Sequence, residues 1–252
     1  MTSFNQSAKT ILITCGSFNP VHNFHLRMLE LIKSNLSRQF SIPKNNFIGL
    51  LSPCSDGYKK PGLQPYTTRS KLINLACKNS TNNWIKLSEL EGSRAEWTPT
   101  FKVLQEIGQI YKKEDPKNQI VFCCGADVLA SMIRPKLWRD SELKQMMNDN
   151  YLAVVTREGI QIPEIINKLK ETVFCDSENE SSLLDEKIII IEDELQDNLS
   201  STFIRKRLLA GDDVKYLVPD EVNDYLIENQ VYTEESLKIN TDVVLAPLSR
   251  GD

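Results

Sequence analysis

The chain has 252 residues, of which 40% are hydrophobic and 25% charged, and its formal net charge is −4. This length and composition suit one large α/β domain or two small ones and allow a sizeable buried core. The mild acidity argues against a general nucleic-acid binder, no apolar run is long enough to cross a membrane, and the first ten residues lack the apolar segment of a secretory signal.

Short apolar runs alternate with segments of helical periodicity along the first two thirds of the chain. We predict buried strands at 9–15, 46–52, 84–87, 119–124, 151–156 and 187–191. Helices are predicted at about 23–36, from Pro65 onward, and at 98–111, 200–210 and 219–229. Apolar strands separated by helices favour an α/β fold, a Rossmann-like doubly wound parallel sheet with helices on both faces and a small C-terminal helical part.

The last third of the chain differs in charge. Residues 157–197 contain twelve acidic and four basic residues, and the polar stretch 176–182 (DSENESS) predicts a surface loop or a disordered insert. The helix at 200–210 starts with capping residues and stops at Gly211, a good helix-ending glycine. The segment 243–247 (VVLAP) is compatible with an added edge strand or a docked extension.

Metal-ligand spacing is absent from the sequence. The six cysteines form no CxxC pair, and the two histidines, His22 and His25, lie three positions apart. A structural zinc site is therefore improbable, and we expect no protein metal ligands. Reduced thiols in an intracellular protein, cytoplasmic or nuclear and not secreted, are the expected state.

The segment 16–25 (GSFNPVHNFH) follows the first strand and leads into a helix. Gly16 allows the backbone to approach a ligand closely, and the helix start offers free N–H groups and a positive dipole end to a phosphate. His22 and His25 can donate hydrogen bonds to phosphate oxygens there, although polar residues near a helix start are the simpler alternative. Because neither GxGxxG nor GK[ST] is present, a redox dinucleotide fold or a Walker ATPase is disfavoured.

Two segments together resemble the signatures of the HxGH nucleotidylyltransferase superfamily. The first is the Gly-x-Phe-x-Pro turn followed by HNFH (22–25), in which Phe24 stands where the superfamily has glycine. The second is LSSTFIR (199–205), which is similar to the ISSTxIR segment and follows in the right order.

Further segments resemble eukaryotic nicotinamide mononucleotide adenylyltransferases and extend the resemblance to nearly the whole chain. They are 52–63, 95–104, 124–129, 137–138, 214–222 and 243–248. The approach to the second signature, 193–202, matches only loosely, and the link from Trp97 to the strand before Gly125 has no long insert. The resemblance implies a single nucleotidylyltransferase domain over 1–252, with its helical part and tail at about 200–252.

The implied reaction is adenylyl transfer in NAD biosynthesis. The 5′-phosphate of nicotinamide mononucleotide, or of nicotinic acid mononucleotide, attacks the α-phosphorus of ATP and gives NAD, or deamido-NAD, and pyrophosphate. Mg2+ would accompany ATP, held mainly by its phosphates and water. The expected partners are these small molecules and no nucleic acid, and the resemblance implies a homo-oligomer.

The resemblance assigns catalytic roles to His25 first, then to His22 and Arg205, which would hold the ATP phosphates and steady the developing charge. Trp97 would stack on the nicotinamide ring, and Asp127, at the carboxyl end of a strand, is placed to bind ribose hydroxyls. The residues expected to bind the nucleotides are Gly16, Ser17, Phe18, Tyr58, Lys60, Trp97, Thr100, Gly125, Asp127, Leu137, Trp138, Ser201, Thr202, Phe203 and Ile204.

Two alternatives stay open at this point. One is another HxGH-type enzyme, a pantetheine-phosphate adenylyltransferase or a cytidylyltransferase, against which Trp97 and the GYKK loop (57–60) argue. The other is a non-catalytic nucleotide-binding or chaperone-like module on the same fold, against which the intact HNFH and SSTFIR segments argue.

Overall fold

The structure of the protein is a computed structural model, which describes residues 4–240 except 79, 136 and 196–198. Within these residues, six strands form one fully parallel sheet in the order β3-β2-β1-β4-β5-β6. The strands are β1 (Thr10–Gly16), β2 (Phe47–Pro53), β3 (Ile85–Leu87), β4 (Gln119–Gly125), β5 (Tyr151–Val155) and β6 (Ile188–Ile191).

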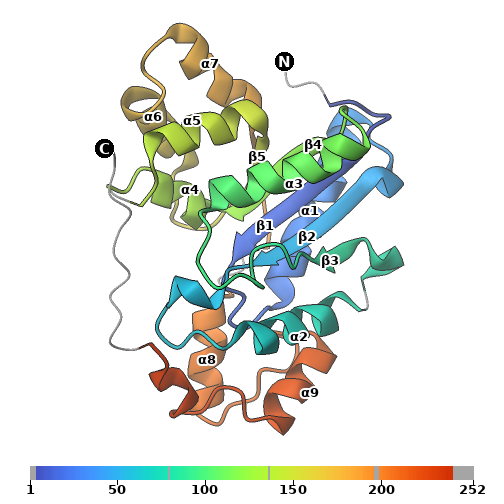
Figure 1. Ribbon diagram of the computed structural model, residues 1–252, viewed down its shortest axis with the longest axis vertical. Helices are drawn as coiled ribbons and strands as arrows, with labels where there is room; N and C mark the ends of the chain where they lie inside the picture. The colour runs from blue at the N-terminus through green and yellow to red at the C-terminus, as the bar shows by residue number, and fades with distance from the viewer. Residues whose placement is uncertain (1–3, 79, 136, 196–198, 241–252) are drawn as a thin grey trace.

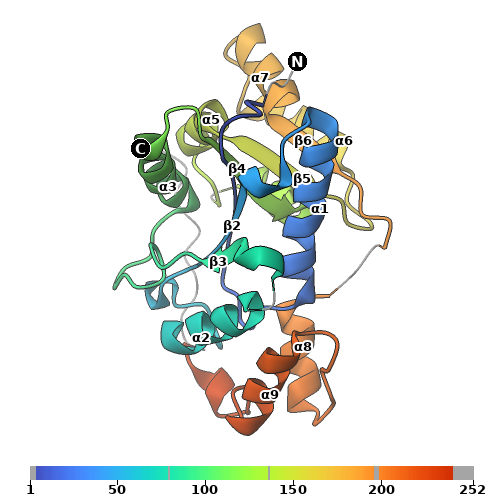
Figure 2. The same ribbon diagram turned by 90° about the vertical axis from the view of Figure 1, so that its right-hand side faces the viewer.

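Helices cover both faces of the sheet (Figures 1 and 2). On one face lie α1 (Asn23–Phe40) and α2 (Tyr66–Cys77), and α8 (Ser201–Leu209) and α9 (Asp220–Glu228) extend the same apolar cluster beyond the carboxyl-end edge of the sheet. On the other lie α3 (Thr100–Glu114), α4 (Ala126–Met132), α5 (Asp140–Asp149), α6 (Ile162–Thr172) and α7 (Glu178–Lys187). Short 3-10 helices occur at η1 (Lys44–Asn46), η2 (Asp56–Tyr58), η3 (Thr81–Asn83) and η4 (Ser236–Lys238). The predicted doubly wound α/β class is confirmed.

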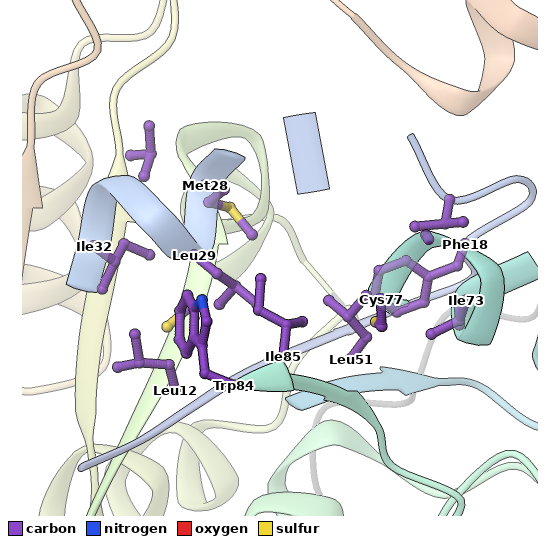
Figure 3. Close-up of a cluster of buried hydrophobic side chains, with 14 of the residues drawn as sticks. Leu12, Phe18, Met28, Leu29, Ile32, Leu51, Ile73, Cys77, Trp84 and Ile85 are labelled. Carbon is purple, nitrogen blue, oxygen red and sulfur yellow. The ribbon is translucent and has the colours of Figure 1, made fainter. Parts of the chain in front are cut away.

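Successive side chains along each strand point to opposite faces of the sheet, and this divides the core into two clusters. In β1, Leu12 faces α1 and α2, whereas its neighbours Ile11 and Ile13 face α3 and α4. Figure 3 shows the first cluster, in which Leu29 of α1 and Trp84 pack over the sheet. Because both faces are covered, the strands are apolar runs and not alternating ones.

The strand order reverses direction between β1 and β4, which are neighbours in the sheet. The chain leaves β1 at Gly16 toward α1 on one face, and leaves β4 at Gly125 toward α4 on the other. In an open parallel sheet this switch point opens a crevice at the carboxyl ends of the strands, where ligands bind. The fold thus brings the two predicted phosphate and ribose segments to one edge.

Most predicted elements agree with the structure to within one or two residues, and α1 is one turn longer than predicted. The prediction of a loop or disordered insert at 176–182 is wrong: α7 starts there, with the Ser177 hydroxyl accepting the N–H of Glu180 and acidic residues in the first turn. Trp97 precedes α3 and lies in the loop before it. The segment 243–247 lies outside the described residues.

Candidate active site

The turn after β1 is held rigidly by buried polar contacts. Phe18 is buried at a left-handed φ of 45°, and the buried Asn19 side chain donates to the Gly62 carbonyl at 2.8 Å. The Oδ1 of Asn19 accepts the Gln64 N–H at 3.1 Å and the Tyr232 hydroxyl at 2.9 Å. Such a satisfied buried network fixes the position of the turn.

The two histidines stack on each other at the start of α1. Their ring centroids lie 3.7 Å apart, and the edge of Phe18 packs against His25. The backbone N–H of His22 donates to Nδ1 of His25 at 3.0 Å, so the proton of a neutral His25 ring is on Nε2. Burial lowers the pKa of His25 to about 3, and burial together with His25 and Arg157 lowers that of His22 to about 2. Both imidazoles are therefore neutral at pH 7.

Two cations lie beside this turn. Arg205 of α8 donates to the Asn19 carbonyl at 2.7 Å, which anchors its guanidinium against the turn. Burial and the charge of Arg205 lower the pKa of Lys60. Within the described part of the chain, neither cation forms an ion pair with a carboxylate. Two close cations without a counter-charge favour an anionic ligand.

The start of α8 packs directly on the same turn. Ser200 caps the helix by accepting the N–H of Phe203 at 3.2 Å, and the Ser201 hydroxyl donates to the Pro20 carbonyl at 2.7 Å. The N–H groups of Ser201 and Thr202 belong to the first turn and have no partner within the helix.

The last two residues of the predicted phosphate segment are placed differently. Ile204 is fully buried in the core and its N–H donates to the Ser200 carbonyl at 3.1 Å, while the side chain of Phe203 is exposed. Since the N–H groups of Phe203 and Ile204 are both engaged at the helix start, Ser201 and Thr202 are the donors that this helix can offer a ligand.

A pocket of about 450 Å³ opens beside the turn, at the carboxyl ends of β1, β2 and β4. The rings of Tyr58 and Trp97 form one wall, with centroids 5.7 Å apart and planes tilted by 35°. Trp138 is fixed by its indole N–H, which donates to Ser131 Oγ at 3.0 Å. The predicted residues that line this pocket are Gly16, Ser17, Tyr58, Lys60, Trp97, Thr100, Leu137 and Trp138.

Gly125 and Asp127 lie at the end of β4, outside the lining of that pocket. The Asp127 carboxylate is exposed, and its Oδ1 lies 3.9 Å from a guanidinium nitrogen of Arg157. A Cβ on Gly125 would approach this oxygen to 2.7 Å, so glycine lets the carboxylate fold over the strand end. A second hollow of about 620 Å³, lined by residues 156–161 and 192–194, adjoins the ends of β5 and β6.

Three further residues at the site were not selected from the sequence. Gly57 lies against the next loop, where a Cβ would fall 2.6 Å from the Ala95 carbonyl oxygen and 2.7 Å from Trp97 N. Glu91 is buried among the residues that line the pocket. Arg69 is buried behind it. A glycine inside the GYKK loop is the one signal that could have pointed to Gly57.

Arg69 ties together the segments that surround the pocket. Its Nε donates to the Gln64 carbonyl at 2.7 Å, and its terminal nitrogens donate to the Ser17 carbonyl at 3.0 Å and the Cys54 carbonyl at 2.8 Å. It also pairs with Asp56 at 2.9 Å. The end of β1 and the loop after β2 are therefore held by one side chain.

The polar groups around the β1 turn suit anions, whereas Glu91 and Glu142 are the carboxyl groups among the pocket lining. Lysine, arginine, neutral imidazole and free N–H groups are all hydrogen-bond donors. Among the described residues, no three His, Cys, Asp or Glu side chains come together in a way that could hold a metal ion.

The helices described here include none that is both long and apolar enough to cross a membrane.

Comparisons with known proteins show the family of this chain. A family model described as Cytidylyltransferase-like matches residues 13–207. The nicotinamide/nicotinic acid mononucleotide adenylyltransferase 1 of Bos taurus is 31% identical over 287 aligned residues, which cover 98% of this chain and 97% of that protein.

Solved structures of similar fold include the Plasmodium falciparum nicotinic acid mononucleotide adenylyltransferase complexed with APC. It is 23% identical with a TM-score of 0.62, and the match covers 89% of this chain and 97% of that one. The same enzyme complexed with NaAD matches with a TM-score of 0.61 at 20% identity, over the same shares of the two chains. At these identities the likeness concerns the fold.

Proposed function

This chain belongs to the nicotinamide/nicotinic acid mononucleotide adenylyltransferases, within the cytidylyltransferase-like family, and on that premise we propose how its site performs adenylyl transfer. The substrates are ATP and nicotinamide or nicotinic acid mononucleotide, and the products are NAD or deamido-NAD and pyrophosphate. The observation that carries the proposal is the junction of an aromatic pocket with a donor-rich rim at the β1 turn.

The pocket receives the mononucleotide. Trp97 and Tyr58 offer flat faces to the pyridine ring, and Thr100 and Trp138 lie around the same space. Lys60 lines the pocket and is influenced electrostatically by Arg205 beyond it. A mononucleotide with its ring against Trp97 therefore directs its 5′-phosphate toward these two cations.

ATP binds at the same turn, next to the mononucleotide. Its phosphates lie against the start of α8, where Ser201 and Thr202 offer N–H groups that the helix itself leaves unpaired, and against Arg205. The adenosine end extends toward Asp127 and the hollow lined by 156–161. This arrangement brings the mononucleotide phosphate and the ATP phosphates together beside Arg205.

The reaction needs alignment and charge stabilisation, and no covalent enzyme intermediate. A phosphate oxygen of the mononucleotide forms a bond to the α-phosphorus, and the bond from that phosphorus to the bridging oxygen of pyrophosphate breaks. His25 donates from Nε2 to a phosphate oxygen as charge develops, because its Nδ1 is occupied by the His22 N–H. A neutral donor holds this hydrogen bond without a proton transfer.

Mg2+ enters as part of the ATP substrate. The donor-rich rim fits the phosphate oxygens, and the phosphates with water supply the hard oxygen ligands that Mg2+ prefers. When bound, the ion neutralises charge on the leaving pyrophosphate. The protein's residues hold and orient the phosphates.

The experiment incubates the purified chain with ATP, Mg2+ and one acceptor at a time, and separates the products by chromatography. Nicotinamide and nicotinic acid mononucleotides are expected to give NAD and deamido-NAD, whereas phosphopantetheine, or CTP with a phosphorylated acceptor, is expected to give no product. His25→Ala is expected to lower kcat about 10²–10³-fold, as for other lost transition-state donors, with an unchanged circular dichroism spectrum. Full activity of that folded variant would remove His25 from the mechanism.

The assembly and location of the protein belong to the same proposal. A homo-oligomer in the cytoplasm or nucleus, with no nucleic-acid partner, follows from the family resemblance alone. Light scattering after size-exclusion chromatography would measure the oligomeric state, and a monomer at micromolar concentration would contradict this part.

A further inference from the structure

Glu91 places a buried carboxyl group in the wall of the mononucleotide pocket. The residue is 3% exposed and belongs to the loop between β3 and α3, as does Trp97. It lines the same pocket as Trp97 and Thr100. Its Oε2 accepts a hydrogen bond from the Ser52 hydroxyl at 3.3 Å. The mechanism proposed above does not use this group.

The cations near Glu91 are committed to other carboxylates. Arg69 pairs with Asp56 at 2.9 Å, and Arg94 pairs with Glu106. In the described part of the chain, Glu91 has no Lys or Arg nitrogen within ion-pair distance. Because nothing nearby neutralises it directly, burial dominates and raises the pKa of Glu91 to about 8, while Ser52 and the two arginines lower it by less.

Three groups around Glu91 do not titrate between pH 6.5 and 9, and Glu142 of α5, which also lines the pocket, pairs with Arg139 at 3.4 Å. Burial raises the pKa of Cys15 at the end of β1, of Cys54 after β2 (to about 11) and of Tyr58 in η2, so all three stay neutral. The pKa of Lys60 is lowered. Lys60 faces the phosphate that both mononucleotides share, so its titration affects both substrates alike.

We infer that Glu91 is a specificity-determining residue that distinguishes the two mononucleotides by the charge of the substituent on the pyridine ring. Its ionised carboxylate disfavours nicotinic acid mononucleotide relative to nicotinamide mononucleotide, and its protonated carboxyl group accepts both. This inference rests on the proposed function. It concerns the one chemical difference between the two acceptors, a carboxylate in place of a carboxamide.

The size of the pocket makes this discrimination strong. A compact space of about 450 Å³ is roughly 10 Å across, so a ring substituent inside it lies within reach of the Glu91 charge. Two like charges about 8 Å apart at an effective dielectric constant of about 20 change a relative affinity by tenfold or more. We therefore expect about a tenfold change in preference when Glu91 ionises.

The experiment measures kcat/KM for both mononucleotides between pH 6.5 and 9 and takes their ratio. Titrations of ATP, the shared phosphate and Lys60 cancel in this ratio. The preference for the nicotinamide form should rise about tenfold with a midpoint near pH 8. A ratio that stays constant in the unmodified protein would overturn the inference without any variant being needed.

Two variants assign the effect to one residue. Glu91→Gln, which keeps the shape and cannot ionise, should give a ratio that does not change with pH. Glu89→Gln removes a charge from an exposed position of the same loop, outside the pocket, and should behave as the unmodified protein does. Equal loss of both activities in Glu91→Gln, with the pH dependence of the ratio retained, would refute the assignment. No product from either mononucleotide would refute the proposed function, and the inference with it.

Discussion

Replacing Arg69 by methionine should destabilise the protein and loosen the pocket together. The variant keeps the unbranched aliphatic stem and removes every donor, so the carbonyls of Gln64, Ser17 and Cys54 lose their partner. A buried polar group without a partner costs about 1–3 kcal/mol. With three carbonyls losing their donor, and water entering the vacated space to offset part of that loss, we expect a loss of about 3–5 kcal/mol in the free energy of unfolding.

The matched control is Asp56→Asn. Its carboxylate is the only charged partner that the structure gives Arg69 among the described residues, but the Asp56 side chain is 57% exposed, and asparagine still offers an acceptor oxygen. An exposed pair of this kind contributes less than about 1 kcal/mol. The contrast between the two variants separates the buried carbonyls from the ion pair.

Urea unfolding followed by fluorescence measures both variants against the unmodified protein. Arg69→Met should also raise KM for the mononucleotide at temperatures where it remains folded, because Ser17 and the loop after β2 are no longer held together. A loss below about 1 kcal/mol for Arg69→Met, or an equal loss for Asp56→Asn, would refute this account of Arg69.

Three other outcomes are expected. Trp97→Ala should raise KM for the mononucleotide about tenfold and leave KM for ATP unchanged, since stacking of one base on an aromatic ring contributes about 1–3 kcal/mol. Equal changes in both KM values would contradict the placement of the pyridine ring against Trp97. Gly57→Ala should weaken mononucleotide binding because its Cβ would fall 2.6 Å from the Ala95 carbonyl oxygen. Its control is Gly108→Ala in α3, where the nearest atom is 3.7 Å away, which should be neutral or stabilising. Comparable binding constants for the two variants would show that the loop around Gly57 accommodates the added methyl group. Removal of Mg2+ with a chelator should abolish turnover and leave the thermal unfolding temperature unchanged, and a lowered unfolding temperature would instead indicate a resident ion.

The strands and the helix-start motifs were predictable because their causes are local. Apolar runs such as 119–124 are strands because both faces of the sheet are covered, and Ser200 caps α8 through a residue three positions away. The helix α7 was missed for the converse reason. Only Leu184 in it is buried, so its polar sequence carries almost no periodicity.

The sequence predicted some of the residues of the site, but it did not predict how they are arranged. The chain's two histidines and Trp97 stood out by residue type and spacing, and the hydrogen bond from His22 to His25 joins positions only three apart. Ile204, by contrast, belongs to the second signature and proves to be a core residue. A signature identifies a segment that contributes to the site, but the direction in which each of its side chains points depends on what packs against it.

The sequence by itself determined the fold class, the six strands and five of the helices, because periodicity and capping act over a few residues, and its resemblance to a known family marked the two signature segments. Only the tertiary structure decided the roles of Arg69 and Glu91. Arg69 acts on a carbonyl 52 positions away, and Glu91 receives its hydrogen bond from a residue 39 positions away. A charged residue in a polar sequence looks solvated until the fold removes the water around it, and it is the loss of that water that gives both groups their effect.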